Sequence, residues 1–419
     1  MLTDRPASAL LFSLLGVISF AVAACSDGAK AHDADAGAAG LSGSIPISSG
    51  AGRGGSGGRA AGGGSGGGEG NAFWTQSTQI STNGNDPKRF FLMGDGGWIV
   101  RVGIPALGEH HWSFDQGATW TRFHTPWRGP VFADSTFWLL GIGLDGTPIA
   151  RWSYPLDCNE CAAAGAPGMP GDTLLIRYDR ATNAWQPIDV LPPAAKDVQN
   201  IGRTATPSPT ELWLFGSTSL FRWSGPGTAT QVSLPDDHVV VDDVAGKPGG
   251  GAFLVSQGEL FAWPSSGTAW QPMTLPPSMP VTTAATARKV HVDRAGQLYV
   301  VGFDFDGHSI YRADAAGVWT TISPERPAAP ANNTPSDWLL GAGRTGALLA
   351  VTASYPSQSG MKPTLTVRSS TNHGATWLDR TAGLPNSVPQ DIVFDADGRA
   401  YFCARDGGTF VWTSPTPLP

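Results

Sequence analysis

Two eight-residue stretches of this chain are close copies of each other, although they lie in different halves of the sequence. Residues 113–120 read SFDQGATW, and residues 370–377 read STNHGATW. A catalytic motif is usually needed once, whereas a turn that recurs indicates a structural unit that recurs. The chain is therefore expected to be an array or a ring of similar units, with this turn as their common landmark.

Weaker relatives of the turn fill the interval between the two copies. Each follows predicted strands and leads into a short polar strand that ends near a proline; the four lie at residues 177–192, 221–235, 261–276 and 311–324. Five of the six turns carry a tryptophan at the same place, namely Trp120, Trp185, Trp270, Trp319 and Trp377. Spacings of about 40 to 65 residues are typical of four-stranded propeller blades with loops of variable length.

Short apolar runs bounded by turn residues recur along this part of the sequence. Examples are RFFLM, GWIVRV, ELWLFG, GAFLVS and QLYVVGF. Because these runs are short, and because no long stretch has an apolar period of 3.6 residues, they indicate strands rather than helices. The sequence therefore predicts an all-β fold that consists of a single β-propeller.

The two ends of the predicted ring complement each other. The last unit starts near Asp391 and has strands but no tryptophan turn after them, so it lacks an outer strand. Residues 72–80, AFWTQSTQI, form a predicted strand without another partner. Pairing the two removes exposed sheet edges, which predicts seven four-stranded blades with the last one closed by the N-terminal strand. The spacing alone also allows six or eight blades.

The first residues have the pattern of an export signal. Residues 7–24 carry no charge, and their number suits the apolar segment of a secretory signal but is short for a membrane span. Small residues before Cys25 resemble the lipobox of bacterial lipoproteins, which implies cleavage before Cys25 and lipid on that residue; an ordinary secretory signal is the alternative. Residues 1–24 are thus expected to be a signal peptide, 25–70 a disordered Gly/Ser/Ala-rich tether, and 71–419 the propeller.

The repeated turn resembles the Asp-box, Ser-x-Asp-x-Gly-x-Thr-Trp, of sialidases and other BNR-repeat propellers. The matching positions are Ser113, Asp115, Gly117, Thr119 and Trp120 in the first copy and Ser370, Asn372, Gly374, Thr376 and Trp377 in the second. Asp or Asn can accept hydrogen bonds from N–H groups within a turn, and Gly tolerates positive φ. The resemblance implies that the turn joins the outer two strands of a blade and fastens it without taking part in chemistry. Its tryptophan is expected to be buried.

A sialidase-like hydrolase would need more than the Asp-box. The resemblance implies an Arg triad, a tyrosine nucleophile with a glutamate partner, an acid aspartate and an early Arg-Ile-Pro motif. The nearest match to that motif is RVGIP at residues 101–105, with two extra residues between Arg and Ile. Tyr178, Tyr299, Tyr311 and Tyr401 fall within predicted strands, and no Tyr–Glu pair can be assigned. The sequence therefore assigns no catalytic residue and favours a protein that is not an enzyme, with an exo-sialidase or another glycoside hydrolase as the alternative.

Other chemical signals in the sequence are sparse. The net charge is −7 and no basic stripe is present, so nucleic acid is not an expected partner. No two histidines have metal-ligand spacing, and no metal or cofactor is predicted. Cys158 and Cys161 form a C-x-x-C pair that is expected to be a local disulfide outside the cytoplasm; free thiols or a metal pair are the alternatives.

These features together predict a surface-tethered lipoprotein of the cell envelope, expected at the outer membrane and facing the periplasm or the exterior. Its propeller is expected to be a monomer that binds a glycan or an envelope protein without catalysis. The long loops at 127–172 and 353–366 are the expected binding surface, because loops vary most where function varies. A sialidase-like glycoside hydrolase is the competing prediction.

Overall fold

The computed structural model describes most of the expected propeller. The described residues are 73–80, 87–102, 109–123, 136–153, 171–204, 211–276, 287–304, 307–325, 333–335, 338–356, 363–384, 391–405, 409–414 and 417–418. They all lie within one compact unit, Gly68–Pro419. The expected signal peptide and tether lie outside the described residues, as do Cys25, Cys158 and Cys161.

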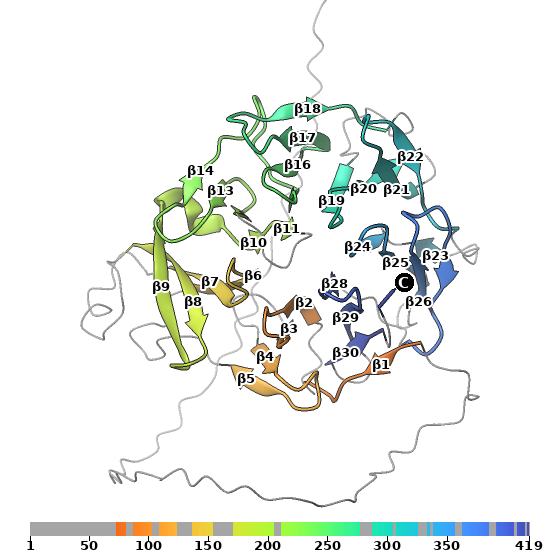
Figure 1. The fold of residues 1–419 in the computed structure, drawn as a ribbon, viewed down its shortest axis with the longest axis horizontal. Coiled ribbons are helices and arrows are strands. Elements are labelled where there is room, and N and C mark those ends of the chain that lie inside the picture. The colour runs from red at the N-terminus through yellow and green to blue at the C-terminus, as the bar shows by residue number, and fades with distance from the viewer. Residues whose placement is uncertain are drawn as a thin grey trace, which may run out of the picture. The chain divides into compact units, whose positions relative to one another are not determined.

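Seven antiparallel sheets surround a central axis, and each sheet is one blade of a β-propeller (Figure 1). Blades are numbered here in chain order, and their strands are given from the axis outward. Blade 1 contains β2 (Pro87–Leu92), β3 (Trp98–Val102), β4 (Glu109–Ser113) and β5 (Thr121–Phe123). Blade 2 contains β6 (Thr136–Ile142), β7 (Pro148–Ser153), β8 (Thr173–Asp179) and β9 (Ala184–Leu191). Blade 3 contains β10 (Asn200–Ile201), β12 (Leu212–Phe215), β13 (Leu220–Trp223) and β14 (Thr230–Gln231).

The remaining four blades follow the same order. Blade 4 contains β15 (Asp243–Gly246), β16 (Ala252–Ser256), β17 (Glu259–Trp263) and β18 (Gln271–Met273), with β11 (Arg203–Thr204) parallel to β15. Blade 5 contains β19 (Ala287–Val292), β20 (Leu298–Asp304), β21 (Gly307–Ala313) and β22 (Trp319–Thr321). Blade 6 contains β24 (Leu339–Ala342), β25 (Leu348–Pro356), β26 (Thr364–Ser370) and β27 (Leu378–Asp379), with β23 (Asn333–Pro335) also on β25. Blade 7 contains β28 (Ile392–Phe394), β29 (Ala400–Arg405), β30 (Thr409–Thr413) and β1 (Thr75–Gln76).

The inner strands are apolar on both faces because each sheet packs between two others. Every residue of β3 and of β16 is buried. Core clusters therefore form between neighbouring blades: the ring centroids of Phe90 and Trp98 in blade 1 lie 5.8 and 5.4 Å from that of Tyr401 in blade 7. Within the described residues the one helix is η2 (Pro193–Asp197), a 3-10 helix that leads from blade 2 to blade 3.

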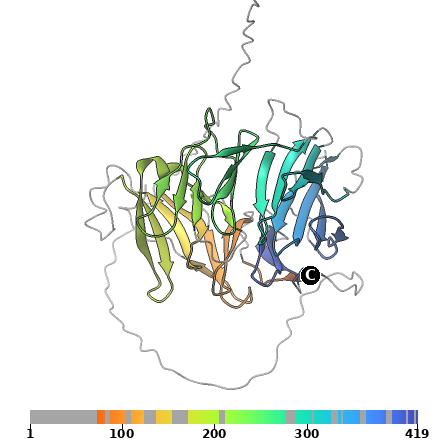
Figure 2. The same ribbon diagram turned by 45° about the horizontal axis from the view of Figure 1, so that its top comes forward.

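The alternating strand directions give the ring two distinct faces, and the strands run between them (Figure 2). Turns between first and second strands and between third and fourth strands lie on one face, called here the turn face. Turns between second and third strands lie on the other face together with the segments that lead to the next blade. This second face is called the connection face.

The ring closes where strands from the two ends of the propeller pair. β1 pairs antiparallel with β30, and the contact continues beyond the strand. The Ser77 N–H donates to Val411 O at 2.9 Å, and the Ile80 N–H donates to Thr409 O at 2.8 Å. The prediction of seven four-stranded blades closed by an N-terminal strand is confirmed.

The turn between β4 and β5 holds the first copy of the repeated motif. Asp115 Oδ1 accepts from the Ser113 hydroxyl at 2.7 Å and from the Thr119 N–H at 2.9 Å, and its Oδ2 accepts from the Thr119 hydroxyl at 2.6 Å. The Gly117 N–H donates to Ser113 Oγ at 2.8 Å. Gln116 and Gly117 have φ of 56° and 83°, the left-handed region that glycine enters without steric cost.

The turn between β26 and β27 repeats this network. Asn372 Oδ1 accepts from the Ser370 hydroxyl at 3.0 Å and from the Thr376 N–H at 2.9 Å. The Gly374 N–H donates to Ser370 Oγ at 2.8 Å, and Gly374 again has φ of 83°. One bond is reversed, because the Asn372 amide donates to Thr376 Oγ1 at 2.9 Å. The two sequences thus build the same turn with either an acid or an amide at its centre.

In three blades the tryptophan of this turn connects the blade to the preceding one. The indole N–H donates to a backbone carbonyl in three cases: Trp270 to Ser233 at 3.1 Å, Trp319 to Thr274 at 2.7 Å and Trp377 to Ile322 at 2.7 Å. Trp120 and Trp377 are half-buried. The expectation that these two rings are buried is therefore wrong, because the turn lies at the rim, where the short outermost strand covers only part of the ring.

We expect Asp115→Asn to keep the turn and to reduce the acid sensitivity of the fold. Hydrogen bonds from the Thr119 hydroxyl, the Thr119 N–H and Ser113 lower the pKa of Asp115 to about 2. This lies below the unfolded value of about 3.9, so the carboxylate stabilises the fold above that pH, and its contribution is lost as the pH falls through about 2. Urea unfolding between about pH 5 and about pH 2 should show a smaller loss of stability for Asp115→Asn than for the wild type. The reciprocal variant Asn372→Asp should lose more stability over this pH range than the wild type. If stability depended on pH in both variants as it does in the wild type, Asp115 would not be a source of the acid sensitivity.

Candidate functional site

Two arginines interrupt otherwise apolar strands near the connection face. Arg101 lies near the end of β3 and Arg151 near the end of β7, and their exposed fractions are 8% and 4%. Both β3 and β7 are second strands of their blades, so both run toward the connection face. The two buried guanidinium groups therefore belong to the same end of the ring, in neighbouring blades.

The innermost strands add three polar or aromatic side chains at this level. Arg89 of β2 stands opposite Arg101 in its sheet, and Trp138 of β6 stands opposite Arg151. The Arg101 guanidinium carbon lies 5.4 Å from the centroid of the Trp138 ring. An Nη2–H of Arg89 donates to Oδ1 of Asn200 on β10, so the contacts span three blades. We call Arg89, Arg101, Trp138, Arg151 and Asn200 the axial arginine cluster, because β2, β6 and β10 border the axis (Figure 1).

The surroundings of Arg101 disfavour its positive charge. Burial and the neighbouring Arg89 lower the pKa of Arg101 to about 10, against a weaker opposite effect of Asp391. Burial, together with Arg101, lowers the pKa of His110 to about 3, so that this histidine is neutral at pH 7. The Arg101 guanidinium still carries its charge at neutral pH, beside a second arginine.

Arg151 is held in a similar electrostatic situation. Burial lowers its pKa, and the negative charge of Asp197 acts in the opposite direction. Asp197 is already engaged, since it accepts hydrogen bonds from the Thr218 N–H at 3.0 Å and from the Thr218 and Ser219 hydroxyls. The Nε and Nη1 atoms of Arg151 are buried and have no hydrogen-bond partner among the described residues.

This arrangement has the chemistry of a site for an anionic group. A buried cation without a hydrogen-bonded partner is costly, and a guanidinium presents a planar fork of donors that matches a carboxylate or a phosphate. An anion that reaches Arg151, or the adjacent Arg89 and Arg101, would therefore supply hydrogen bonds and charge balance that the described residues do not provide. The Trp138 ring would supply an apolar flank to the same ligand.

Reasoning from the sequence did not find this cluster. It noted Arg101 only as part of RVGIP, and it passed over Arg89 and Arg151. A usable signal was present, because PIARWS places a single charged residue in a strand that is otherwise uncharged and whose first five residues are buried. A single arginine in a buried strand needs a hydrogen-bond or ion-pair partner, which either the protein or a ligand provides.

The predicted turn residues lie away from the cluster. Both motif copies join third and fourth strands, so they belong to the turn face and the rim, whereas the arginines belong to the connection face. Cys403 is buried in β29, and burial raises the pKa of its thiol. The prediction of one long loop over 127–172 is wrong for residues 136–153, because their apolar runs form β6 and β7 of blade 2. The second predicted loop, 353–366, begins with the end of β25 and ends with the start of β26. Residues 127–135, 154–170 and 357–362 lie outside the described residues.

The four tyrosines in predicted strands are buried. Tyr178, Tyr299, Tyr311 and Tyr401 have exposed fractions of 5%, 0%, 1% and 5%. Tyr299 and Tyr401 lie at the beginning of second strands and Tyr178 lies at the end of a third strand, which places all three toward the turn face. None of these three phenols is at the end of the ring that holds the arginines.

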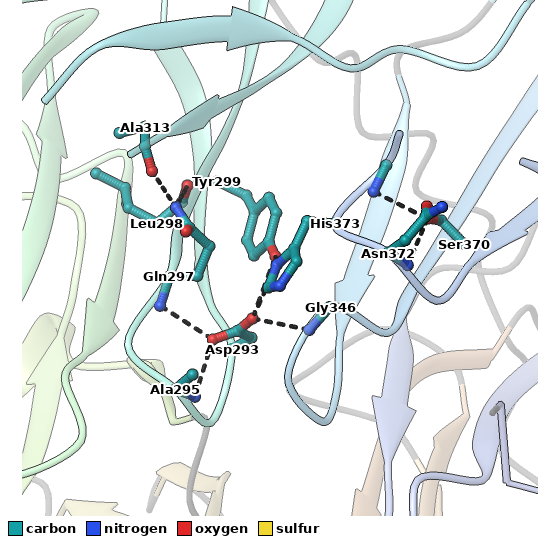
Figure 3. Close-up of polar contacts among 11 residues, drawn as sticks. Asp293, Ala295, Gln297, Leu298, Tyr299, Ala313, Gly346, Ser370, Asn372 and His373 are labelled. Atoms are coloured by element: carbon teal, nitrogen blue, oxygen red, sulfur yellow. Dashed lines mark hydrogen bonds and ion pairs between the residues drawn. The ribbon is translucent and has the colours of Figure 1, made fainter. Parts of the chain in front are cut away.

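Tyr299 links blades 5 and 6 on the turn face (Figure 3). Its hydroxyl lies 3.1 Å from Asp293 Oδ2 and 2.8 Å from His373 Nδ1. Asp293 also accepts from the N–H groups of Gln297 at 3.0 Å and Gly346 at 3.1 Å. Burial and the Asp293 charge raise the pKa of Tyr299, so the phenol stays protonated. This arrangement holds two blades together through the second copy of the repeated turn.

Comparisons with known proteins find structural relatives and no family. No family model matches the chain, and no curated protein matches it. The structure of virginiamycin B lyase from Staphylococcus aureus covers 81% of this chain and 99% of its own, with 13% identity and a TM-score of 0.52. The structure of YCF48 bound to D1 peptide covers 82% of this chain and 95% of its own, with 14% identity and a TM-score of 0.52.

A third relative is an extracellular domain. The extracellular domain of the putative one-component system BT4673 from B. thetaiotaomicron covers 80% of this chain with 13% identity and a TM-score of 0.50, and the match spans 39% of that chain. At such identities the similarity shows the fold alone. The class to which the chain belongs is that of the seven-bladed β-propellers.

Metal binding and membrane insertion can be considered for the described residues. Among them, no three His, Cys, Asp or Glu side chains are grouped as a metal site would need. Nor does any helix in this part of the chain have the length and apolar character required to cross a membrane.

Proposed function

We propose that this protein is a binding propeller of the bacterial cell envelope that holds an acidic group of a glycan or of a protein partner at the axial arginine cluster. The observation that carries the proposal is Arg151, which is 4% exposed and whose Nε and Nη1 lack a hydrogen-bond partner among the described residues. A desolvated guanidinium of this kind is suited to receive a carboxylate from a ligand. No catalytic step is required of the site.

The structural relatives support a binding role in general terms. One propeller of this shape was solved with a bound peptide, and another is the extracellular part of a putative one-component system. These properties belong to those proteins, and they make a binding role on the envelope a reasonable extension to this chain. The repeated turns, which share the residue pattern of the Asp-box and BNR repeats, would act as blade fasteners in such a scaffold.

The proposed position of the protein rests on its N-terminal sequence. We propose lipidation at Cys25, a tether over residues 25–70 and anchorage in the outer membrane. As a random coil, a segment of this length would reach roughly 35–40 Å. That reach would hold the connection face clear of the lipid surface, so that a large ligand could enter it.

The axial arginine cluster also favours a second candidate, a sialidase-like glycoside hydrolase, because the resemblance to that family implies an Arg triad. Such an enzyme would also need a nucleophile beside the arginines. Tyr178, Tyr299 and Tyr401 are buried toward the opposite face. This position favours binding without turnover.

A glycan-array screen of the full chain tests both candidates. We expect binding of sialylated or uronic-acid glycans, or capture of an acidic envelope protein, with binding that weakens as salt rises because the contact is ionic. Mass spectrometry of the same sialylated and plant-type glycans should detect no released sugar. Released sugar would establish the hydrolase, and binding of the acidic ligands that is unchanged in Arg151→Met would contradict a role for the arginines.

A further inference from the structure

A cleft of about 1010 Å³ opens at the rim between blades 3 and 4. One wall comes from β13, β14 and the segment after β14, and the other comes from β17, β18 and the turn between them. The volume is in the range of pockets that hold small organic ligands. The residues of the axial arginine cluster do not line this cleft, which is therefore a separate candidate site.

Aromatic side chains form a rigid surface in the cleft. Trp263 and Trp270 both line it, with ring centroids 5.2 Å apart at an interplanar angle of 69°. The Trp270 indole N–H donates to Ser233 O at 3.1 Å and so spans the two walls. Phe261 packs edge to face with His238 at 4.9 Å. These rings are fixed by one another before any ligand arrives, which lowers the entropy cost of binding.

Hydroxyl and amide side chains provide much of the remaining lining. They are contributed by both blades and are Ser224, Thr228, Thr230, Gln231, Ser233 and Thr268. A hydroxyl can donate one hydrogen bond and accept two, so such a wall matches a ligand that itself carries many hydroxyls. The aromatic rings match the apolar C–H face that a pyranose ring presents.

The charge of the cleft disfavours an acidic ligand. Two exposed carboxylates, those of Asp236 and Glu259, line it. The one arginine in the lining, Arg222, forms an ion pair with the buried Glu211, which offsets its charge. Glu259 Oε2 also lies 3.6 Å from His238 Nε2, which compensates its charge only when the histidine is protonated. With a neutral histidine the cleft carries negative charge, and carboxylate oxygens form strong hydrogen bonds with hydroxyl donors.

We propose that the cleft between blades 3 and 4 is a binding site for a neutral saccharide. The sugar ring lies against Trp270, its hydroxyls bond the threonine and serine side chains, and Glu259 accepts from a hydroxyl at one end. This site goes beyond the proposed function, which concerns an acidic group at the axial arginine cluster. The two sites select opposite ligand chemistry, so they can be tested independently.

The experiment is a saturation-transfer NMR titration of the full chain with cellotetraose, xylotetraose, mannotetraose, maltotetraose and chitotetraose, each up to roughly 10 mM. Thr230→Trp fills the cleft from an exposed strand position, and Glu259→Gln removes one carboxylate. Thr320→Trp is the matched control, because Thr320 of β22 stands opposite Arg312 just as Thr230 of β14 stands opposite Arg222. Thermal unfolding of each variant monitors the fold.

At least one tetrasaccharide should bind, and Thr230→Trp and Glu259→Gln should each weaken it about tenfold or more. Thr320→Trp and Arg151→Met should bind it like the wild type, which would separate this site from the axial cluster. Failure of all five sugars to bind would overturn the proposal, and so would equal binding by Thr230→Trp and the wild type. Neither of these negative results would bear on the acidic ligand of the proposed function.

Discussion

Trp74→Ala should destabilise the propeller by about 3–5 kcal/mol, because it removes a large buried ring next to the strand that closes the ring. Trp74 directly precedes β1 and is 4% exposed. Its ring packs edge to face on Phe402 at 4.9 Å, and its indole N–H donates to Arg380 O at 2.7 Å in the neighbouring blade. The measurement is urea unfolding followed by tryptophan fluorescence and circular dichroism.

Trp120→Ala is the matched control for this prediction. Trp120 ends the first repeated turn but is half-buried, so its removal should cost only about 1–2 kcal/mol. Each variant keeps fifteen of the sixteen tryptophans, so fluorescence follows unfolding in both and the stabilities can be compared. Equal destabilisation by the two substitutions would show that the closing segment contributes no more than an ordinary rim position.

The second large effect is expected at Arg151. Arg151→Met should stabilise the fold by about 1–4 kcal/mol, because an apolar side chain of similar length replaces a buried charge that no hydrogen bond of the described residues compensates. The same variant should lose binding of the acidic ligand selected in the screen. Gain of stability with loss of binding is the behaviour expected of a residue retained for function.

Arg177→Met serves as the control in the next strand of the same blade. Arg177 is exposed and forms an ion pair with Asp145 at 2.8 Å, so its replacement should change stability by less than about 1 kcal/mol. It should leave acidic-ligand binding intact. If Arg151→Met were strongly destabilised instead, the arginine would have to be a structural anchor, and the assignment of the axial site would be wrong.

The blade architecture could be predicted because its signals come from residues that are close together in the sequence. The two copies of the repeated turn differ at Asp115 and Asn372, yet both satisfy the same backbone N–H groups, so pattern alone identified the unit. The lack of an outer strand after Asp391 and the lone strand at residues 72–80 indicated how the ring closes. Such signals depend on neighbouring residues in the chain, which a sequence displays directly.

The axial arginine cluster could not be predicted in the same way. Arg89 stands opposite Arg101 in blade 1, and Arg101 reaches Trp138, which stands opposite Arg151 in blade 2, so the cluster forms only through the pairing of strands and the packing of two blades. Strand register decides on which face of the sheet each side chain lies, and a shift of one residue would move every side chain of the strand to the other face. The rim cleft has the same origin, since Thr230 and Trp270 lie on outer strands or turns of two different blades. Spatial neighbours of this kind can be identified only when the pairing of the strands and the packing of the blades are known in three dimensions.

The pairing of β1 with β30 also imposes an order on biosynthesis. β1 is made before every other strand of the propeller and finds its partner only when β30 has been made. At typical elongation rates of about 5–20 residues per second, that interval lasts roughly 20–70 s. During this time six blades can assemble while the seventh stays incomplete, with its edge open to other chains. A chain that ends before β30 would therefore be an open arc with an unpaired strand edge, prone to aggregation, so the finished ring depends on completion of the last blade.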